Sequence, residues 1–344
     1  MAEINEVLIQ HVFQEMLKYK PSLQKMLVTD EDDEETLGTR FLGDIIIKSF
    51  PWPIGVEIRT LLSASMRQLD RLRLDQIFKT IERGMQFISF VMICQLWKEN
   101  KEKKLDLPEN LRKEFTTRLQ VLTMGNYTWL IRAIGNVINE KSIPWFMPEM
   151  GTNFDKKFYA ALDFWVPERN DIGHYQINLT HQEIEKRCVE YEEKLIFILE
   201  RIAFLCKYKL VSVREIKVIH PKYQQAKFNH IINLLNSSDS DFKAQELEEL
   251  KFAESQSVLL MKSLKTLDEY LNLSPLIIDT SQEVIDTKDK FDIKEDIFMY
   301  TKFQNDQLNY IGTEITEKCD LKNLNNYQLL VSQFQDMMST FQTG

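Results

Sequence analysis

The chain has 344 residues, of which 44% are hydrophobic and 28% are charged, and it carries a formal net charge of −9. This apolar content is enough for a packed core and excludes a disordered or collagen-like protein. No apolar run reaches the roughly 18 residues that a membrane-spanning helix requires, and the first residues lack the features of a signal peptide. We therefore expect a cytoplasmic protein with no membrane partner.

The charges are unevenly distributed along the chain. Residues 57–209 contain 24 basic and 21 acidic side chains, whereas the remainder contains 19 basic and 31 acidic ones. The acidic total argues against a protein that permanently coats nucleic acid. The mildly basic middle is compatible with transient contact to a phosphate chain, and the overall length predicts more than one domain.

Residues 1–56 are expected to form a helical N-terminal extension. Apolar residues recur at roughly helical spacing over Asn5–Met26. Six consecutive acidic residues follow at Asp30–Glu35, a pattern typical of a solvated loop. The Pro51-Trp52-Pro53 triplet then disfavours helix at the residues that precede each proline, so we place a domain boundary near residue 56.

Residues 57–209 are predicted to form an α-helical bundle. The helices are expected at Ile58–Lys79, Thr80–Glu99, Leu111–Leu122, Tyr127–Ile138 and Phe158–Trp165. A turn is expected at Met124–Asn126, and Pro167 is expected to end the helix before it. Thr180 and Glu183 form a capping-box pattern that opens a long closing helix reaching Lys207.

Residues 210–344 are predicted to form an α+β module, so the fold class is mainly α with a mixed C-terminal part. Runs rich in β-branched residues predict strands at Leu210–Val213, Ile216–Ile219, Lys227–Leu235 and Ser257–Met261. Residues 297–300 and 308–311 are expected to pair as a hairpin with a loop longer than the two-residue minimum. A final amphipathic helix is expected at Asn323–Phe341.

The sequence carries no pattern for a metal or an organic cofactor. The cysteines are scattered, form no C-x-x-C pair and lie in apolar contexts, where free buried thiols are expected; they are Cys94, Cys188, Cys206 and Cys319. The five histidines form no H-E-x-x-H or comparable ligand pattern, and no glycine-rich phosphate loop is present. We therefore expect no cofactor and no metal.

One short segment combines residues suited to phosphodiester chemistry. Arg169 is followed directly by Asn170, and His174 lies five residues after the arginine. The planar guanidinium fork of arginine matches a phosphate group, and histidine exchanges protons near neutral pH. A second pair, Arg214 and His220, lacks the asparagine and lies in a predicted strand, so we discount it.

The segment resembles the R-x4-6-H motif of HEPN domains, the all-helical higher eukaryote and prokaryote nucleotide-binding superfamily, in its R-N-x-x-x-H form. The resemblance covers about residues 57–209. It implies a metal-independent endoribonuclease of a bacterial toxin or anti-phage defence system. In that role His174 would move the proton of the ribose 2′-hydroxyl or of the leaving oxygen, Arg169 would hold the scissile phosphate, and Asn170 would orient the site.

The resemblance also implies partners. They are an RNA substrate (tRNA is one candidate), a second copy of the chain that completes the cleft, and an antitoxin or other defence protein. Residues 210–344 would then sense a signal or restrain the nuclease. Some related toxins carry a tyrosine two residues after the histidine, where a nucleotide is attached, but Gln176 holds that place here.

Two other interpretations of the segment remain open. Arg169 could pair with Glu168 or Asp171 on a helix surface while His174 is an ordinary helix histidine, in which case the motif is a coincidence. Alternatively, the bundle could be a catalytically inactive HEPN scaffold that binds other components of a defence or nucleotide-signalling complex.

Overall fold

Helices dominate the fold, and in the part of the chain that the structure describes the strands lie between residues 209 and 312. The computed structural model describes residues 5–27, 38–174, 179–235, 244–281, 295–315 and 321–343. The prediction of a mainly α protein with a C-terminal α+β part is confirmed.

Contacts within the chain divide it into two units that interleave along the sequence. The first contains the described residues of Met1–Phe87 and Met147–Tyr208, and the second contains Ile88–Phe146, Lys209–Leu235 and the described residues of Asp241–Gly344. The 33-residue helix α4 (Arg71–Lys103) supplies residues to both units. The boundary expected near residue 56 lies inside a helix, whereas in the described residues the chain passes between the units after Phe87, Phe146 and Tyr208.

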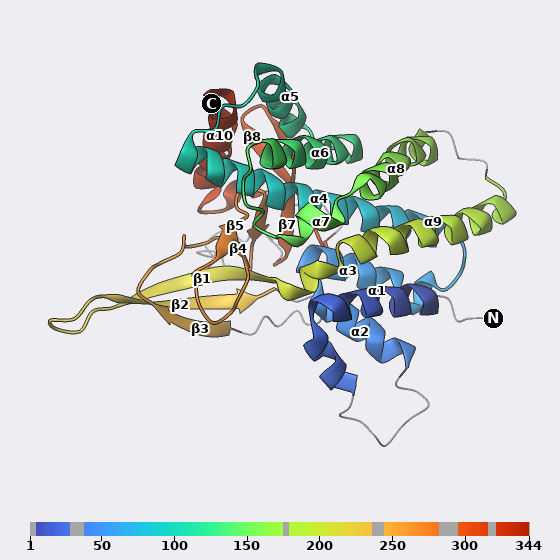
Figure 1. The fold of residues 1–344 in the computed structure, drawn as a ribbon, viewed down its shortest axis with the longest axis horizontal. Helices are drawn as coiled ribbons and strands as arrows, with labels where there is room; N and C mark the ends of the chain where they lie inside the picture. The colour runs from blue at the N-terminus through green and yellow to red at the C-terminus, as the bar shows by residue number, and fades with distance from the viewer. Residues whose placement is uncertain are drawn as a thin grey trace. The chain divides into compact units, whose positions relative to one another are not determined.

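The first unit is helical. Its α-helices are α1 (Glu6–Tyr19), α2 (Thr39–Ser49), α3 (Trp52–Leu61), the first half of α4, α7 (Glu149–Asn153), α8 (Lys156–His174) and α9 (His181–Arg201). Short 3-10 turns occur at η1 (Pro21–Leu27), η2 (Ala64–Met66) and η3 (Ala203–Lys207). Helix α1 packs against α2, α9 and η3 with an apolar face on which Leu8, Val12 and Met16 are fully buried (Figure 1).

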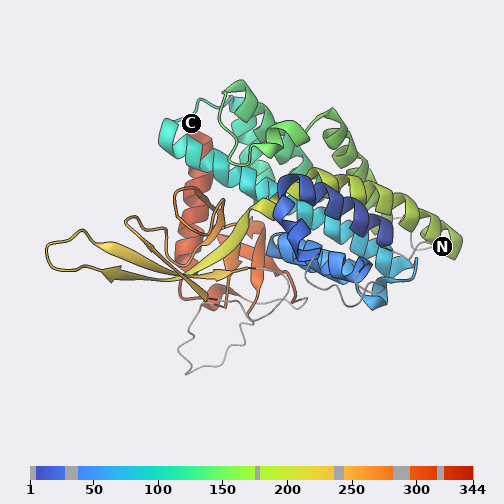
Figure 2. The ribbon, with the colours of Figure 1, turned by 60° about the horizontal axis from the view of Figure 1, so that its bottom comes forward.

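The second unit contains two antiparallel sheets. The larger has the order β3-β2-β1-β4-β5 and is built from β1 (Lys209–Ile219), β2 (Lys227–Leu234), β3 (Ala244–Glu249), β4 (Val258–Met261) and β5 (Tyr270–Asn272). Strands β1 and β2, in yellow, continue as a ribbon past the shorter strands (Figure 2). Val211, Val213, Ile232, Leu259 and Met261 form an apolar cluster on this sheet.

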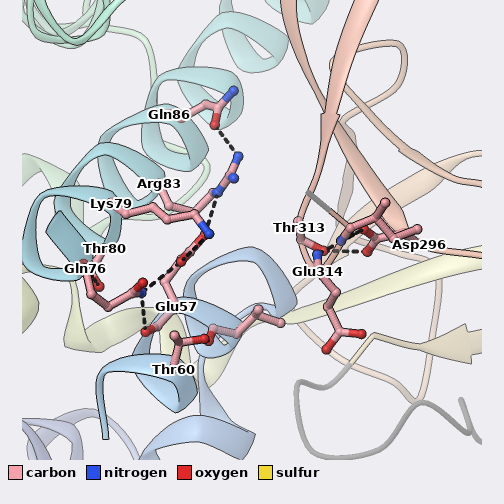
Figure 3. A network of polar contacts seen from close by, with 12 residues as sticks. Glu57, Thr60, Gln76, Lys79, Thr80, Arg83, Gln86, Asp296, Thr313 and Glu314 are labelled. Carbon is pink, nitrogen blue, oxygen red and sulfur yellow. Dashed lines mark hydrogen bonds and ion pairs between the residues drawn. The ribbon is translucent and has the colours of Figure 1, made fainter. Parts of the chain in front are cut away.

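The smaller sheet of the second unit has the order β6-β7-β8 and is accompanied by helices. Its strands are β6 (Ile277–Asp279), β7 (Ile297–Gln304) and β8 (Gln307–Gly312). The helices are α5 (Glu109–Gln120), α6 (Met124–Glu140), η4 (Leu321–Asn323) and α10 (Tyr327–Thr343), with the second half of α4. Buried Asp296 organises the end of β8, because its carboxylate accepts hydrogen bonds from Thr313 Oγ1 and from the backbone N–H of Glu314 and Ile315 at 2.7–3.0 Å (Figure 3).

Several predicted elements differ from the structure in their boundaries. The expected break between two helices near residue 80 is absent, and the chain breaks at 62–70 instead, where the carboxylate of Asp70 accepts the N–H of Arg73 and caps α4. The expected turn at Met124–Asn126 is the first turn of α6, capped by the Thr123 hydroxyl. The two strands expected at 210–213 and 216–219 are one strand, β1, with an irregular register near Arg214.

The hairpin of β7 and β8 is tighter than predicted. Gln304 pairs with Gln307, so only Asn305 and Asp306 form the turn. Both residues have positive φ, 53° and 56°, which the twist-matched two-residue turns require and which asparagine and aspartate tolerate. The prediction of a longer loop was wrong because the strands extend to the turn itself.

Candidate functional site

Helix α8 carries the whole R-N-x-x-x-H segment. The prediction that the helix ends before Pro167 was wrong, because α8 runs from Lys156 to His174 with the proline inside it. Arg169, Asn170 and His174 therefore lie in one continuous helix. A proline in a helix interior removes one backbone hydrogen bond at a cost of about 3 kcal/mol, so packing elsewhere must compensate.

An aromatic cluster provides that packing just before the motif. The ring of Trp165, fully buried, meets Phe78 of α4 and Tyr191 of α9 edge-on, with ring centroids 5.3 and 5.5 Å apart. Phe78 and Tyr191 also contact each other, at 5.5 Å. Edge-to-face rings at this distance attract one another in addition to the gain from burial. The cluster thus joins α4, α8 and α9 within one turn of Arg169.

Glu168, the neighbour that could have neutralised Arg169, is bound by α9 instead. The Tyr191 hydroxyl donates a hydrogen bond to its carboxylate, and Arg187 lies 3.8 Å from the same oxygen. Burial, together with the hydrogen bond to Glu168, raises the pKa of Tyr191, so the phenol stays protonated and keeps donating. The sequence left open a pairing of Arg169 with Glu168, but Glu168 contacts Tyr191 and Arg187 instead.

Arg169 lies on the surface of the first unit and faces a carboxylate of α4. Its Nε atom is 3.8 Å from Oε2 of Glu82, and the two side chains are 45% and 34% exposed. An ion pair of this length between exposed groups contributes little to stability. The guanidinium can therefore exchange this partner for a phosphate group at small cost.

A buried polar network next to Glu82 escaped the sequence analysis. Glu57 of α3 is fully buried, and its carboxylate accepts hydrogen bonds from Gln76 at 3.0 Å and from Arg83 at 3.4 Å, with Lys79 at 3.3 Å (Figure 3). Arg83 also donates to Gln86 at 2.7 Å. The partners on α4 share helical spacing, but Glu57 is far from them in sequence, so no local pattern indicated the network.

The other two predicted site residues are described only in part. The backbone of Asn170 and His174 belongs to α8, but their side chains lie outside the described residues, as does the side chain of Asp171. Tyr175 and Gln176 also lie outside the described residues. The chain is described again from Leu179, and the predicted capping box is confirmed: Thr180 and Glu183 exchange hydrogen bonds at the start of α9.

Three other histidines, His230, His11 and His181, contact residues outside the motif. His230 is fully buried in the second unit, where Nε2 accepts the N–H of Ala253 at 3.1 Å, so the proton resides on Nδ1 near the carbonyl of Phe228. His11 lies 3.0 Å from Glu200, and His181 lies 3.4 Å from Glu185 on the same helix. The discounted Arg214 is in strand β1, as expected.

The thiols of the described cysteines are buried. Cys94, Cys188 and Cys206 are free and buried, which confirms the prediction for these three, and Cys319 lies outside the described residues. Burial raises the pKa of the Cys188 thiol to about 11, so it is protonated at neutral pH and is a poor nucleophile.

Neither a metal cluster nor a membrane span is found in the part of the chain that the structure describes. No three histidine, cysteine, aspartate or glutamate side chains converge there on one point. No helix among the same residues has the length and apolar character needed to cross a bilayer.

Comparison with known proteins gives no independent assignment. The chain matches no family model, no curated protein and no solved structure.

Proposed function

We propose that the chain is a metal-independent endoribonuclease of the HEPN type, acting in the cytoplasm as part of a toxin or anti-phage defence system. Its active form is a homodimer, its substrate is RNA, and residues 210–344 sense a signal or restrain the activity, alone or with a partner such as an antitoxin. Arg169, Asn170 and His174 carry the reaction.

The observation that carries this proposal is the state of Arg169. The guanidinium is 45% exposed at the end of a helix, and the adjacent acid, Glu168, is bound by Tyr191 and Arg187. A cation kept at the surface by a weak pair with Glu82 is suited to bind phosphate. Helix α8 continues past Pro167, so the backbones of the three motif residues lie in one helix. Five residues advance about 140° beyond a full turn, so the long side chain of Arg169 has to curl around the helix to approach His174.

The reaction needs one base and one acid. His174 removes the proton of the ribose 2′-hydroxyl, the 2′-oxygen attacks the phosphorus, and the bond to the 5′-oxygen breaks as that oxygen receives a proton. Arg169 stabilises the charge that develops on the phosphate oxygens, and Asn170 orients the site. The products are a 2′,3′-cyclic phosphate and a 5′-hydroxyl. A single motif offers one histidine, so a second copy is needed to supply the other proton-transfer group.

The test is cleavage of total RNA and purified tRNA in EDTA by the wild-type protein and by Arg169→Ala, Asn170→Ala and His174→Ala. We expect the wild type to release cyclic-phosphate ends, and each substitution in the motif to lower the rate by about 100-fold or more. The matched controls are Arg214→Ala and His220→Ala, because that pair has similar spacing but lies in strand β1 and directly after its end. Both controls should retain full activity.

Other outcomes would favour the alternatives. Equal cleavage by the wild type and His174→Ala would assign the activity to a contaminant or to another site. RNA binding that Arg169→Ala weakens, without any cleavage, would favour the inactive scaffold. A monomeric mass in light scattering, together with full activity, would contradict the composite cleft.

A further inference from the structure

Strand β1 extends beyond one of its two neighbours in the larger sheet. Residues 209–212 are paired on both sides, with β4 on one side and with β2 on the other from Val211 onward. Val213 makes the last backbone hydrogen bonds on the β4 side, to the carbonyl of Ser257 at 2.9 Å and from the N–H of Gln256 at 3.1 Å. Residues 214–219 then have β2 as their only strand neighbour in the described part of the chain (Figure 2). This segment therefore presents a free strand edge.

The free edge carries backbone groups that a further strand can bind. In an antiparallel pair, successive residues point their N–H and C=O groups alternately toward the neighbouring strand and away from it. About half of the backbone groups of residues 214–219 therefore point away from β2. An edge of this kind is a template on which another extended chain adds as a strand.

The other two edges of the same sheet are protected against such pairing. Strand β3 forms one edge and carries three side chains of the same charge, Glu246, Glu248 and Glu249. Strand β5 forms the other edge and is only three residues long. Repelling charges and short length both keep an edge unpaired. The free segment of β1 is longer, contains no proline and carries charges of both signs, so it lacks these protections.

The free segment also exposes β-branched side chains. Residues 210–213 of the same strand are buried, whereas the side chains of Val218 and Ile219 are 64% and 36% exposed. Val218 is paired with Phe228 of β2, so the two side chains share one face of the sheet. A strand added at this edge would cover part of this apolar surface and remove it from water.

The charges of the free segment are complementary to those of the same segment in a second copy of the chain. Glu215 and Lys217 lie on one face of the strand, and Ile216 between them lies on the other. The two charged side chains are 3.5 Å apart and more than half exposed, so their mutual pairing is weak and either can take another partner. In antiparallel pairing about a two-fold axis at Ile216, Glu215 of each copy lies opposite the partner's Lys217. Opposite charges in directly opposing positions stabilise a pair of strands.

Other registers of the same pairing are less favourable. An axis at Glu215 or at Lys217 would place two like charges directly opposite each other, which destabilises a strand pair. An axis at Val218 would bring no opposite charges together and would shorten the paired segment, because Pro221 has no N–H to donate. The charge pattern therefore selects a second copy of this chain in one register, as a symmetric interface requires.

We propose that residues 214–218 pair antiparallel with the same residues of a second copy, so that the larger sheet continues across a two-fold axis at Ile216. Glu215 and Lys217 of each copy form two symmetry-related ion pairs, and the outward backbone groups of the free edge gain hydrogen-bond partners. Strand β1 belongs to the second unit, so the proposal does not depend on how the two units are placed. It is also independent of ribonuclease activity.

Sedimentation velocity of the full chain over a range of concentrations tests the proposal. We expect the wild type to dimerise, and Glu215→Lys and Lys217→Glu each to weaken the dimer by about tenfold or more, because each substitution opposes like charges at both symmetry-related pairs. An equimolar mixture of the two single variants should form a heterodimer, since every opposing pair then has opposite signs again. The double variant Glu215→Lys/Lys217→Glu should dimerise as the wild type does.

The control variant is Glu140→Lys, which makes the same change of charge at an exposed position of α6 and should leave the dimer unchanged. Circular dichroism shows whether each variant is folded. A wild type that stays monomeric at about 100 μM, where even a weak complex would form, overturns the proposal. A dimer that both single variants leave equally strong, or a mixture of them that forms no heterodimer, overturns it as well. Such a dimer would be held by another surface, and RNA cleavage by that protein would leave the proposed function intact.

Discussion

Glu57 is a fully buried acidic residue of the first unit. Its carboxylate has no exposed surface, and Arg83 beside it is only 5% exposed. Removing a charge from water is unfavourable unless partners replace the lost hydration. Gln76, Arg83 and Lys79 of α4 supply those partners, so the pairing of α3 with α4 depends on all of them being present together.

Removal of the carboxylate should therefore be costly. In Glu57→Ala, Arg83 loses a buried acceptor, and we expect the free energy of unfolding to fall by about 3 kcal/mol or more. Equilibrium urea unfolding followed by circular dichroism measures the change. The matched control is Asp75→Ala. Asp75 and Arg71 form an exposed ion pair on α4, which should contribute less than about 1 kcal/mol to the free energy of unfolding. Similar losses in both variants would contradict the assignment.

Helix α8 is the element whose length decides the proposed site. If it ended before Pro167, the arginine and the histidine of the motif would lie in a loop of undefined geometry. Instead the proline is exposed on a continuous helix, and the burial of Phe158, Leu162 and Trp165 on the other side compensates for the missing hydrogen bond. The helix thus tolerates an unfavourable residue because its apolar face is well packed.

Replacing that proline should stabilise the protein. Pro167→Ala restores a backbone donor in the helix interior and loses no buried surface, so we expect a gain of about 1–3 kcal/mol. Thermal and urea unfolding measure it. Pro108→Ala is the matched control, since Pro108 is also exposed but precedes α5, where no helical hydrogen bond is missing. A neutral or destabilising effect of Pro167→Ala would contradict the prediction that the proline destabilises α8.

The elements that sequence patterns predicted well are those with local signals. The capping box marks the start of α9, and β-branched runs mark β2 and β4 to within one residue. The elements predicted poorly depend on distant contacts. Helix α8 continues through Pro167 because Phe78 and Tyr191 pack on it from other helices. No window of the sequence around Pro167 contains those residues.

The sequence likewise predicted one part of the candidate site and not the other. The types and spacing of Arg169, Asn170 and His174 were visible in the sequence, and their common helix is now observed. Arg169 lies 87 positions after Glu82, with which it pairs. Glu168 lies 23 positions before Tyr191, which donates a hydrogen bond to it. Such pairings follow from how helices pack, which a single sequence does not encode in any short pattern.

At the scale of the whole molecule, the two units are each assembled from separated parts of the chain. Helix α4 contributes to both units, and residues 88–146 belong to the second unit although the first unit resumes at Met147. Changes in composition and helix-breaking prolines indicate where one segment ends and another begins. They do not indicate which distant segments pack in the same core. The interleaving therefore could not be read from the sequence.

The charge of the whole molecule makes a prediction about RNA. A protein of net charge −9 repels a polyanion, and six of its acidic residues are consecutive at Asp30–Glu35. Replacing these six by asparagine and glutamine changes the net charge to −3. Because long-range repulsion slows association, we expect the variant to bind RNA faster at low ionic strength. At 0.5 M salt the two proteins should associate at similar rates, since salt screens charges over a few ångströms.

Stopped-flow association with a fluorescent RNA measures both rates. The control variant replaces Glu190 and Glu193 of α9 by glutamine. This changes the net charge by only two units, so the association rate should rise by a proportionally smaller amount. An equal rate for all three proteins at low salt would mean that local charges near Arg169, not the net charge, control the encounter. If the rates also differ at high salt, the acidic segment acts by direct contact, either with the RNA or with other residues of this chain. Only direct contacts persist when salt screens long-range charge interactions.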